Sequence, residues 1–147
     1  MKSFTRSDLI VFITHGLNII IHGVIVTFAL LTLLAGNTDH FMGDFFADLF
    51  SLIFLFTSGI SFLGCVFFLG LLIMLRKHKE KASYRVLNGF QIPFASWLLV
   101  YGFILFAAVS KSGIFMFSFT SGITTLSGLA LIFTSIHEIK HHKQGSL

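Results

Sequence analysis

Residues 49–75 read LFSLIFLFTSGISFLGCVFFLGLLIML, an apolar run that contains no charged side chain. At about 1.5 Å of rise per residue, a helix over this run is longer than the roughly 30 Å of hydrocarbon in a bilayer. A span of this length should tilt or protrude slightly from the membrane. The stretch therefore predicts a membrane-spanning helix, and it sets the pattern that the rest of the chain follows.

Three more apolar runs accompany it, at residues 9–34, 90–109 and 114–136. The whole chain is 55% hydrophobic and only 11% charged, with a mean hydropathy of +0.92, whereas a soluble domain carries far more charge. The connections between the runs are short, so successive helices should pack as antiparallel neighbours. The sequence predicts an all-α polytopic membrane protein, in which a single membrane domain (1–147) holds two antiparallel hairpins in a four-transmembrane-helix bundle.

The positions of the basic residues predict the orientation. All but one of the ten Lys and Arg residues precede the first run, lie in the connection 76–89, or follow the last run in the tail 137–147. The exception is Lys111. By the positive-inside rule, both termini and the basic loop are cytoplasmic. The net charge of +4 is therefore explained by membrane orientation and does not indicate nucleic-acid binding. Nucleic acid is not expected as a partner. No targeting segment is recognised, so a bacterial inner (plasma) membrane is expected.

The chain also carries a sign of internal duplication. The pentapeptide FTSGI occurs at 56–60 and again at 119–123, and HGVIV at 22–26 matches YGFIL at 101–105 more weakly. Both copies would run in the same direction through the membrane, as in an internal parallel repeat of two hairpins about an axis along the membrane normal. Chance recurrence in a restricted composition is the alternative, and both interpretations stay open.

A polar stripe interrupts the first run at His15, Asn18 and His22. Spacings of three and four place these side chains on one helix face. Such a face should point into the bundle, because polar groups in hydrocarbon are costly. It could be a proton-sensitive or ligand-binding site with Tyr101 as a partner, or it could only hydrogen-bond to Ser and Thr of the second and fourth spans. Trp97 and Tyr101 lie too deep for an interfacial belt, so their polar atoms should find partners inside the bundle.

The second and fourth spans each have a face of small and hydroxyl side chains. The members are Thr57, Ser61 and Gly64 on one span and Ser121, Thr125 and Gly128 on the other. Small residues let helices approach closely, and hydroxyls can bond across the gap. We expect these faces to pack the two repeats against each other. A hydroxyl-lined ion path is the alternative.

No cofactor is predicted, and the sequence gives only weak support to a haem or a zinc site. A membrane haem needs axial ligands from two helices, yet the second, third and fourth spans contain no His. The tail contains HEIKH at 137–141, which matches a zinc-binding H-E-x-x-H pattern, with His137 and His141 as candidate ligands. The pattern lacks a third ligand and a surrounding cleft. It is therefore interpreted as a chance match in a solvated basic tail.

These observations favour a non-enzymatic membrane protein. The leading hypothesis is a small subunit or accessory protein that packs within a larger membrane complex, because the chain has no extramembrane domain. Its partners would be the lipid bilayer and other membrane subunits, or further copies of itself. The first alternative is an oligomeric small transporter or channel that uses the face of His15, Asn18 and His22. A metal- or haem-binding membrane protein is the second alternative.

Overall fold

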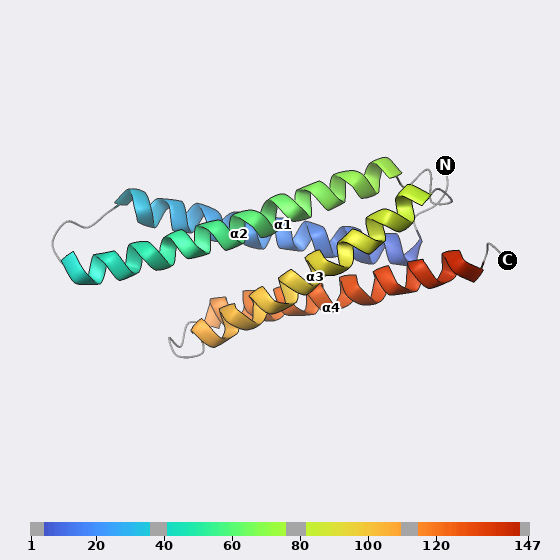
Figure 1. The fold of residues 1–147 in the computed structure, drawn as a ribbon. Helices are drawn as coiled ribbons and strands as arrows, with labels where there is room; N and C mark the ends of the chain where they lie inside the picture. The colour runs from blue at the N-terminus through green and yellow to red at the C-terminus, as the bar shows by residue number, and fades with distance from the viewer. Residues whose placement is uncertain (1–4, 36–40, 76–81, 110–114, 145–147) are drawn as a thin grey trace.

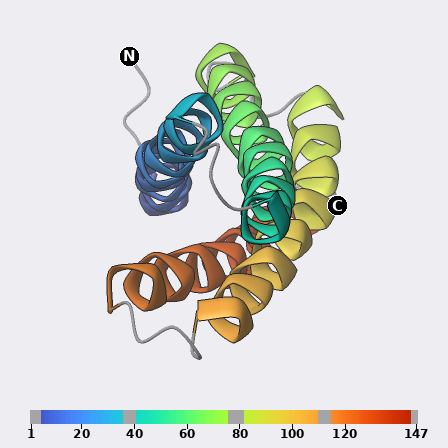
Figure 2. The same ribbon diagram turned by 90° about the vertical axis from the view of Figure 1, so that its left-hand side faces the viewer.

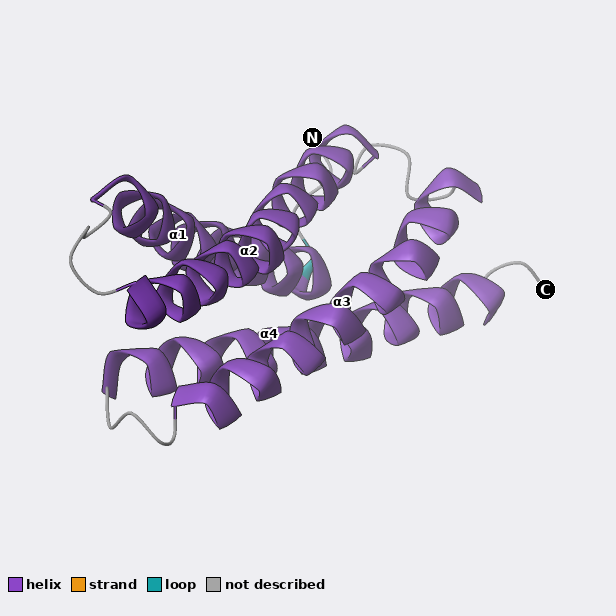
Figure 3. Ribbon diagram, turned by 60° about the vertical axis from the view of Figure 1, so that its left-hand side comes forward, coloured by secondary structure: helices purple, strands orange, loops and turns teal. Residues whose placement is uncertain are grey.

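The residues that the structure describes fold into four α-helices. The structure, a computed structural model, describes residues 5–35, 41–75, 82–109 and 115–144. The helices are α1 (Arg6–Ala35), α2 (Phe41–Leu75), α3 (Ala82–Val109) and α4 (Phe115–Gln144). Each contains a stretch long and apolar enough to cross a membrane, and the described residues include no strand (Figure 3). The predicted all-α membrane bundle is confirmed.

Helices α2, α3 and α4 extend well beyond the predicted apolar spans, and α2 begins at Phe41 instead of at residue 49. Helix α3 begins at Ala82, so the loop predicted at 76–89 is shorter than expected, and α4 continues through most of the predicted tail to Gln144. Hydropathy marks where side chains are apolar, whereas a helix can continue for as long as one of its faces stays packed. In the first turn of α3, Tyr84 provides that packing, because its side chain is buried against the other helices.

The helices run alternately in opposite directions and form two antiparallel hairpins, α1 with α2 and α3 with α4 (Figure 1). Packing is closest within each hairpin. Between the hairpins, α1 contacts α4 more extensively than α2 contacts α3. Seen almost end-on, the four helices surround a common interior (Figure 2). Helices α1 and α3 begin at one end of the bundle, and α2 and α4 end there (Figure 1). We call this end the termini end and the opposite end the far end.

Polar and apolar side chains are sorted as expected for a protein surrounded by lipid. Large apolar side chains cover the outside, where Leu34 is 82% exposed and Phe56 is 75% exposed. The inside is rich in polar groups, because polar side chains in hydrocarbon need partners. The buried polar side chains are Asp8, Thr14, His15, Asn18, His22, Ser58, Ser61, Asn88, Gln91, Ser121, Thr124, Ser127 and Ser135.

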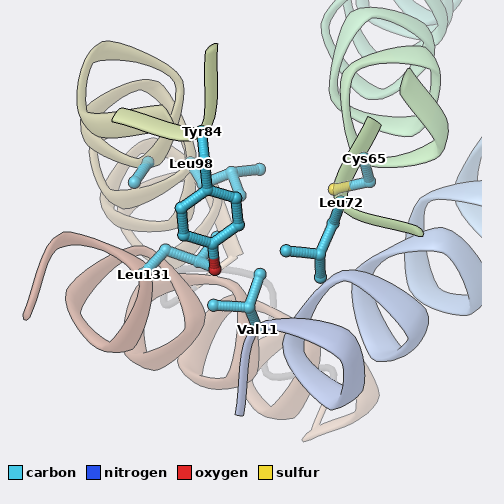
Figure 4. Close-up of a cluster of buried hydrophobic side chains, with 7 residues drawn as sticks. Val11, Cys65, Leu72, Tyr84, Leu98 and Leu131 are labelled. Atoms are coloured by element: carbon cyan, nitrogen blue, oxygen red, sulfur yellow. The ribbon is translucent and has the colours of Figure 1, made fainter. Parts of the chain in front are cut away.

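An apolar cluster holds the four helices together in the half of the bundle nearer the termini end (Figure 4). Every helix contributes to it. Its members are Val11 from α1, Cys65 and Leu72 from α2, Tyr84, Ala95 and Leu98 from α3, and Leu131 from α4. Since lipid removes most of the hydrophobic driving force between helices, close packing of these side chains is what the cluster contributes to stability.

A hydrogen-bonded cap fixes the start of α1. The backbone N–H of Thr5 donates to Asp8 Oδ2 at 3.1 Å, and the backbone N–H of Asp8 donates to Thr5 Oγ1 at 3.3 Å. This reciprocal pair is a capping box, which satisfies two helix-start N–H groups. The Tyr84 hydroxyl donates to the other oxygen of Asp8 at 3.1 Å. The cap of α1 is therefore tied to the first turn of α3.

The two hairpins share features that agree with an internal duplication. The recurrence of FTSGI sets an offset of 119 − 56 = 63 between α2 and α4. Each buried α2 position then corresponds to a buried α4 position: 58, 61, 65, 68 and 72 to 121, 124, 128, 131 and 135. In the first hairpin, Gly23 lies against Phe62. The match of HGVIV with YGFIL pairs Gly23 with Gly102, and Gly102 lies against Thr125, the counterpart of Phe62. The first helices match less well, since Val11 is buried but its counterpart Phe90 is exposed.

Candidate functional site

The buried face of α1 forms a stripe along the whole helix. Its members follow alternating spacings of three and four residues: Asp8, Val11, His15, Asn18, His22, Ile25 and Ala29. This is the heptad pattern of a helix that keeps one seam against its neighbours. The polar members occupy the half nearer the termini end, and the last two members are apolar. The polar column is therefore the segment from His15 to His22 near the middle of the bundle, which Val11 of the apolar cluster separates from Asp8 at the termini end.

His15 is fully buried between α2 and α3. Its ring stacks on Phe68, with centroids 6.0 Å apart and planes 5° apart, and on Phe94, with centroids 6.2 Å apart and planes 28° apart. Its Nε2 lies 3.3 Å from Nε2 of Gln91. Because an amide nitrogen only donates, His15 Nε2 accepts and the ring proton is on Nδ1. That Nδ1 has no hydrogen-bond partner among the described residues.

Asn18 and His22 are also fully buried and less well paired. The Asn18 side chain donates from Nδ2 to the Thr14 carbonyl oxygen at 2.8 Å, within α1. Its Oδ1 and both ring nitrogens of His22 lack a partner in the described part of the chain. The His22 ring faces the Tyr101 ring, with centroids 5.5 Å apart and planes tilted by 36°. The sequence also allowed this face to serve only in hydrogen bonding to Ser and Thr of α2 and α4. The contacts of the described side chains do not follow that pattern.

Four buried atoms on this face share the lack of a partner within the described ranges, and we call them the unpaired atoms. They are Nδ1 of His15, Oδ1 of Asn18, and Nδ1 and Nε2 of His22. Most buried polar atoms in folded proteins are hydrogen-bonded, so each exception needs an explanation. The unpaired atoms mark this face as the candidate site.

Tyr101 and Trp97 form an aromatic wall on α3 beside His22. The Tyr101 hydroxyl and Ser58 Oγ are hydrogen-bonded at 2.5 Å, and Trp97 Nε1 donates to Ser61 Oγ at 3.1 Å. The two rings stack, with centroids 6.2 Å apart and planes 5° apart. The prediction that their polar atoms find partners inside the bundle is confirmed. Tyr101 therefore presents its ring to His22, while its hydroxyl is occupied by Ser58.

The small-residue face of α2 contacts α3. A Cβ on Gly64 would collide with the Phe94 ring, and Ser61 accepts the Trp97 bond described above. The third member, Thr57, donates to the Ile53 carbonyl oxygen of its own helix at 2.7 Å. The face thus positions the aromatic side chains of α3 that surround the site.

The matching face of α4 contacts α3 as well. Ser121 donates to the Gly102 carbonyl oxygen at 2.7 Å, and Thr125 lies against the same glycine. A Cβ on Gly128 would lie 2.7 Å from the backbone oxygen of Ala95. We expected the faces of α2 and α4 to pack against each other; instead, each is packed on α3. The spacing of small residues revealed the faces but not which helix they contact.

The haem and zinc alternatives gain no site from the described side chains. His15 and His22 belong to the same helix, so they cannot provide ligands from two helices on opposite sides of a porphyrin. Of the zinc candidates, His137 is exposed on α4, and the side chain of His141 lies outside the described residues. Across the described ranges, no three His, Cys, Asp or Glu side chains are grouped closely enough to hold a metal ion.

Sequence reasoning missed three members of the site region. Gln91 is the hydrogen-bond partner of His15, and Asp8 and Tyr84 form the buried pair at the termini end. Asp8 could have been found, because it continues the seven-residue spacing of His15 and His22. Gln91 carried no comparable signal, since nothing in its sequence neighbourhood indicates which helix it faces.

The comparisons with known proteins add no name to this site. No family model, curated protein or solved structure matches the chain. The function must therefore be inferred from the chemistry and geometry of the bundle interior.

Proposed function

We propose that this protein is a small membrane carrier that binds a small polar solute inside the bundle, at the inner face of α1. The observation that carries the proposal is the set of unpaired atoms on His15, Asn18 and His22. A buried polar atom without a partner costs about 1–3 kcal/mol, so this face is expensive unless something binds to it. A bound solute would supply the missing hydrogen bonds.

Structural hydrogen bonding alone explains the unpaired atoms poorly. Elsewhere in the bundle, buried side chains such as Ser58, Ser61 and Ser121 bond to α3. The sequence thus pairs its buried hydroxyls where packing requires it. The described atoms that lack partners are on this α1 face, apart from Ser135 Oγ on α4. Such a concentration favours a ligand site over general polar packing.

The site chemistry suggests which solutes would fit. The Nδ1 of His15 donates, Oδ1 of Asn18 accepts, and a neutral His22 offers one donor and one acceptor. Among the described side chains, Asp8 is the buried charged one, and it is already bonded to Tyr84. Rings of Phe68, Phe94 and Tyr101 border the histidines. This environment favours a small uncharged solute with both hydrogen-bond donors and acceptors, such as an amide or a polyol.

The position of the site favours a carrier over a continuous channel. The polar column lies between helices of a single chain, so it does not require an oligomer axis. Beyond His22, the stripe continues with Ile25 and Ala29, which are buried and apolar. On the other side, Val11 and Leu72 of the apolar cluster separate the site from the termini end. A polar site enclosed near the middle of a membrane bundle is the arrangement that alternating-access carriers use.

Thermal unfolding in detergent with a panel of solutes tests the carrier. The panel is acetamide, formamide, glycerol, ethylene glycol and propanol. A solute that binds the folded protein at a hundred times its Kd adds about 2.7 kcal/mol of stability. We expect at least one to stabilise the natural protein and not the His22→Leu variant. Ser135→Ala is the matched control, because it removes an equally unpaired buried group from a different helix, α4, and it should keep the effect. Equal responses of all three proteins would reject the proposal.

A second candidate function is the accessory subunit, which is favoured by two glycines on the outside of the bundle. Gly59 and Gly122 occupy equivalent positions in the two FTSGI segments, and a Cβ on either meets nothing within 4 Å. Small residues on a lipid-facing surface let another helix approach closely. We expect a membrane partner to co-purify in mild detergent and to be lost on Gly59→Leu with Gly122→Leu. Recovery of the natural chain without any partner would argue against this function.

A further inference from the structure

We propose that this site recognises a carboxamide group, and that Gln91 of α3 determines this specificity without touching the solute. The inference rests on the proposed carrier function and narrows its solutes to those in which a carbonyl oxygen lies beside an N–H group. Gln91 Nε2 lies 3.3 Å from Nε2 of His15. Through this contact Gln91 acts as a positioning residue, because it decides which ring nitrogen of His15 carries the proton.

Aromatic side chains hold the His15 ring in one orientation. Phe68 and Phe94 both stack on it, and their own ring centroids are 5.0 Å apart. Phe94 can take this place because its neighbour on α2 is Gly64, where any Cβ would collide with the Phe94 ring. The His15 ring therefore keeps Nε2 beside Gln91, while Nδ1 stays without a partner among the described residues.

The His15 ring is neutral, with its proton on Nδ1. Within the described residues, its hydrogen-bond and ring contacts are with Gln91, Phe68 and Phe94, which carry no charge. A buried charge without a counter-ion is costly, and a neutral imidazole has one N–H donor and one acceptor nitrogen. The amide nitrogen of Gln91 can only donate, so Nε2 is the acceptor. Nδ1 is therefore a free donor.

Asn18 provides a free acceptor beside this donor. Its Nδ2 donates to the Thr14 carbonyl oxygen at 2.8 Å. A carbonyl oxygen only accepts, so this bond fixes the orientation of the Asn18 amide and leaves Oδ1 as the free atom. His15 and Asn18 are three residues apart on one helix face. The Cβ atoms of such a pair lie about 5–6 Å apart.

One amide group matches this donor and acceptor. Its carbonyl oxygen would accept from Nδ1 of His15, and its N–H would donate to Oδ1 of Asn18, each over about 2.9 Å. A hydroxyl in place of the carbonyl would bring an O–H donor that this position leaves unpaired, and a buried unpaired donor is costly. The pair therefore favours an amide over an alcohol or a polyol.

His22 extends the match to a primary amide. It lies four residues beyond Asn18 on the same face, and both of its ring nitrogens lack a partner among the described residues. In the neutral ring, one of them is an acceptor. It would take the second N–H of a primary amide, which secondary and tertiary amides do not have.

Titration of matched solutes into the full chain in lipid bilayers tests the inference. The protein is labelled with ¹⁵N in its histidine rings, and the His15 signals are assigned by their loss in His15→Leu. Acetamide, N,N-dimethylacetamide and ethylene glycol are compared, and the signal changes give each Kd. We expect acetamide to bind about tenfold or more tightly than the other two, since each of them leaves a buried polar atom unpaired. The advantage over N,N-dimethylacetamide should shrink in Asn18→Leu, because one of the acceptors for its N–H groups is gone.

The role of Gln91 is measured from the same spectra. Protonated and unprotonated ring nitrogens resonate at well-separated frequencies, and we expect Nδ1 of His15 to be the protonated one. Gln91→Met removes the donor at nearly the same side-chain size, so the proton should divide between the two nitrogens. A ring with its proton on Nδ1 half of the time binds acetamide about twofold more weakly. Asn88→Leu is the matched control, because it removes another buried amide of α3, one that bonds to the Tyr84 carbonyl oxygen. It should leave the His15 signals unchanged.

The two proposals can fail separately. A natural His15 with its proton on Nε2, or a proton position that does not change in Gln91→Met, would overturn the role of Gln91. Ethylene glycol that binds as tightly as acetamide would overturn amide recognition and keep the carrier. If none of the three solutes binds, the carrier itself is rejected.

Discussion

Replacing His22 with Leu is expected to stabilise the folded bundle by about 1–3 kcal/mol, because it removes two unpaired ring nitrogens from the interior. Both nitrogens lack a partner among the described residues, and the side chain is fully buried. Leucine is close to histidine in size, is a good helix former and can keep the contact with the Tyr101 ring. Reversible unfolding in detergent, monitored by helical circular dichroism, measures the change.

His15→Leu is the matched control for this gain. The two histidines share one face of α1, but His15 bonds to Gln91 and stacks on Phe68 and Phe94. Its removal would leave the Gln91 amide without this partner and lose both ring contacts. We therefore expect a smaller gain than for His22→Leu, or a loss. If His22→Leu proves destabilising, then its ring nitrogens have partners and the carrier proposal loses its basis. A gain would mean that the natural sequence gives up stability to keep this histidine, as functional sites commonly do.

Gly128→Ala is expected to destabilise the bundle by about 1–3 kcal/mol, because the added methyl group has no room against α3. Its Cβ would lie 2.7 Å from the Ala95 oxygen and 2.8 Å from the Leu99 nitrogen. These are backbone atoms, so the contact cannot be relieved by turning a flexible side chain. Relief requires α3 and α4 to move apart, which would also disturb the aromatic wall that faces His22.

Gly122→Ala gives the matched comparison on the same helix. A Cβ at this position meets nothing within 4 Å. The substitution should therefore show only the intrinsic preference of a helix for Ala over Gly, a gain of up to about 1 kcal/mol. The same unfolding measurement applies to both variants. Two glycine variants that changed stability in the same direction and by the same amount would contradict the close packing of α3 and α4 at Gly128.

The helices and the inward polar face could be predicted from sequence because each follows from local geometry. An apolar run long enough to cross a membrane needs no knowledge of its neighbours. The spacing of His15, Asn18 and His22 likewise fixes a common face on any α-helix. The structure bears out both expectations, with four apolar helices and three fully buried polar side chains.

What sequence could not provide is the choice of neighbour. The small-residue faces of α2 and α4 were recognised, yet each is packed on α3. A spacing pattern shows which side chains share a face, whereas the helix opposite depends on how the whole bundle is arranged. The same limit hid Gln91, whose contact with His15 joins residues 76 positions apart in the chain. The early start of α3 was missed because polar side chains in its first turns lower the hydropathy there.

The uneven packing between the two hairpins suggests how a carrier of this size could switch. The α1–α4 contact is more extensive than the α2–α3 contact. A rocking motion of one hairpin against the other would therefore pivot about the α1–α4 seam and part the α2–α3 seam, as rigid repeats rock in larger transporters. The Ser58–Tyr101 and Trp97–Ser61 hydrogen bonds both cross the seam that would open. These two bonds would hold the seam closed in one orientation and break in the other.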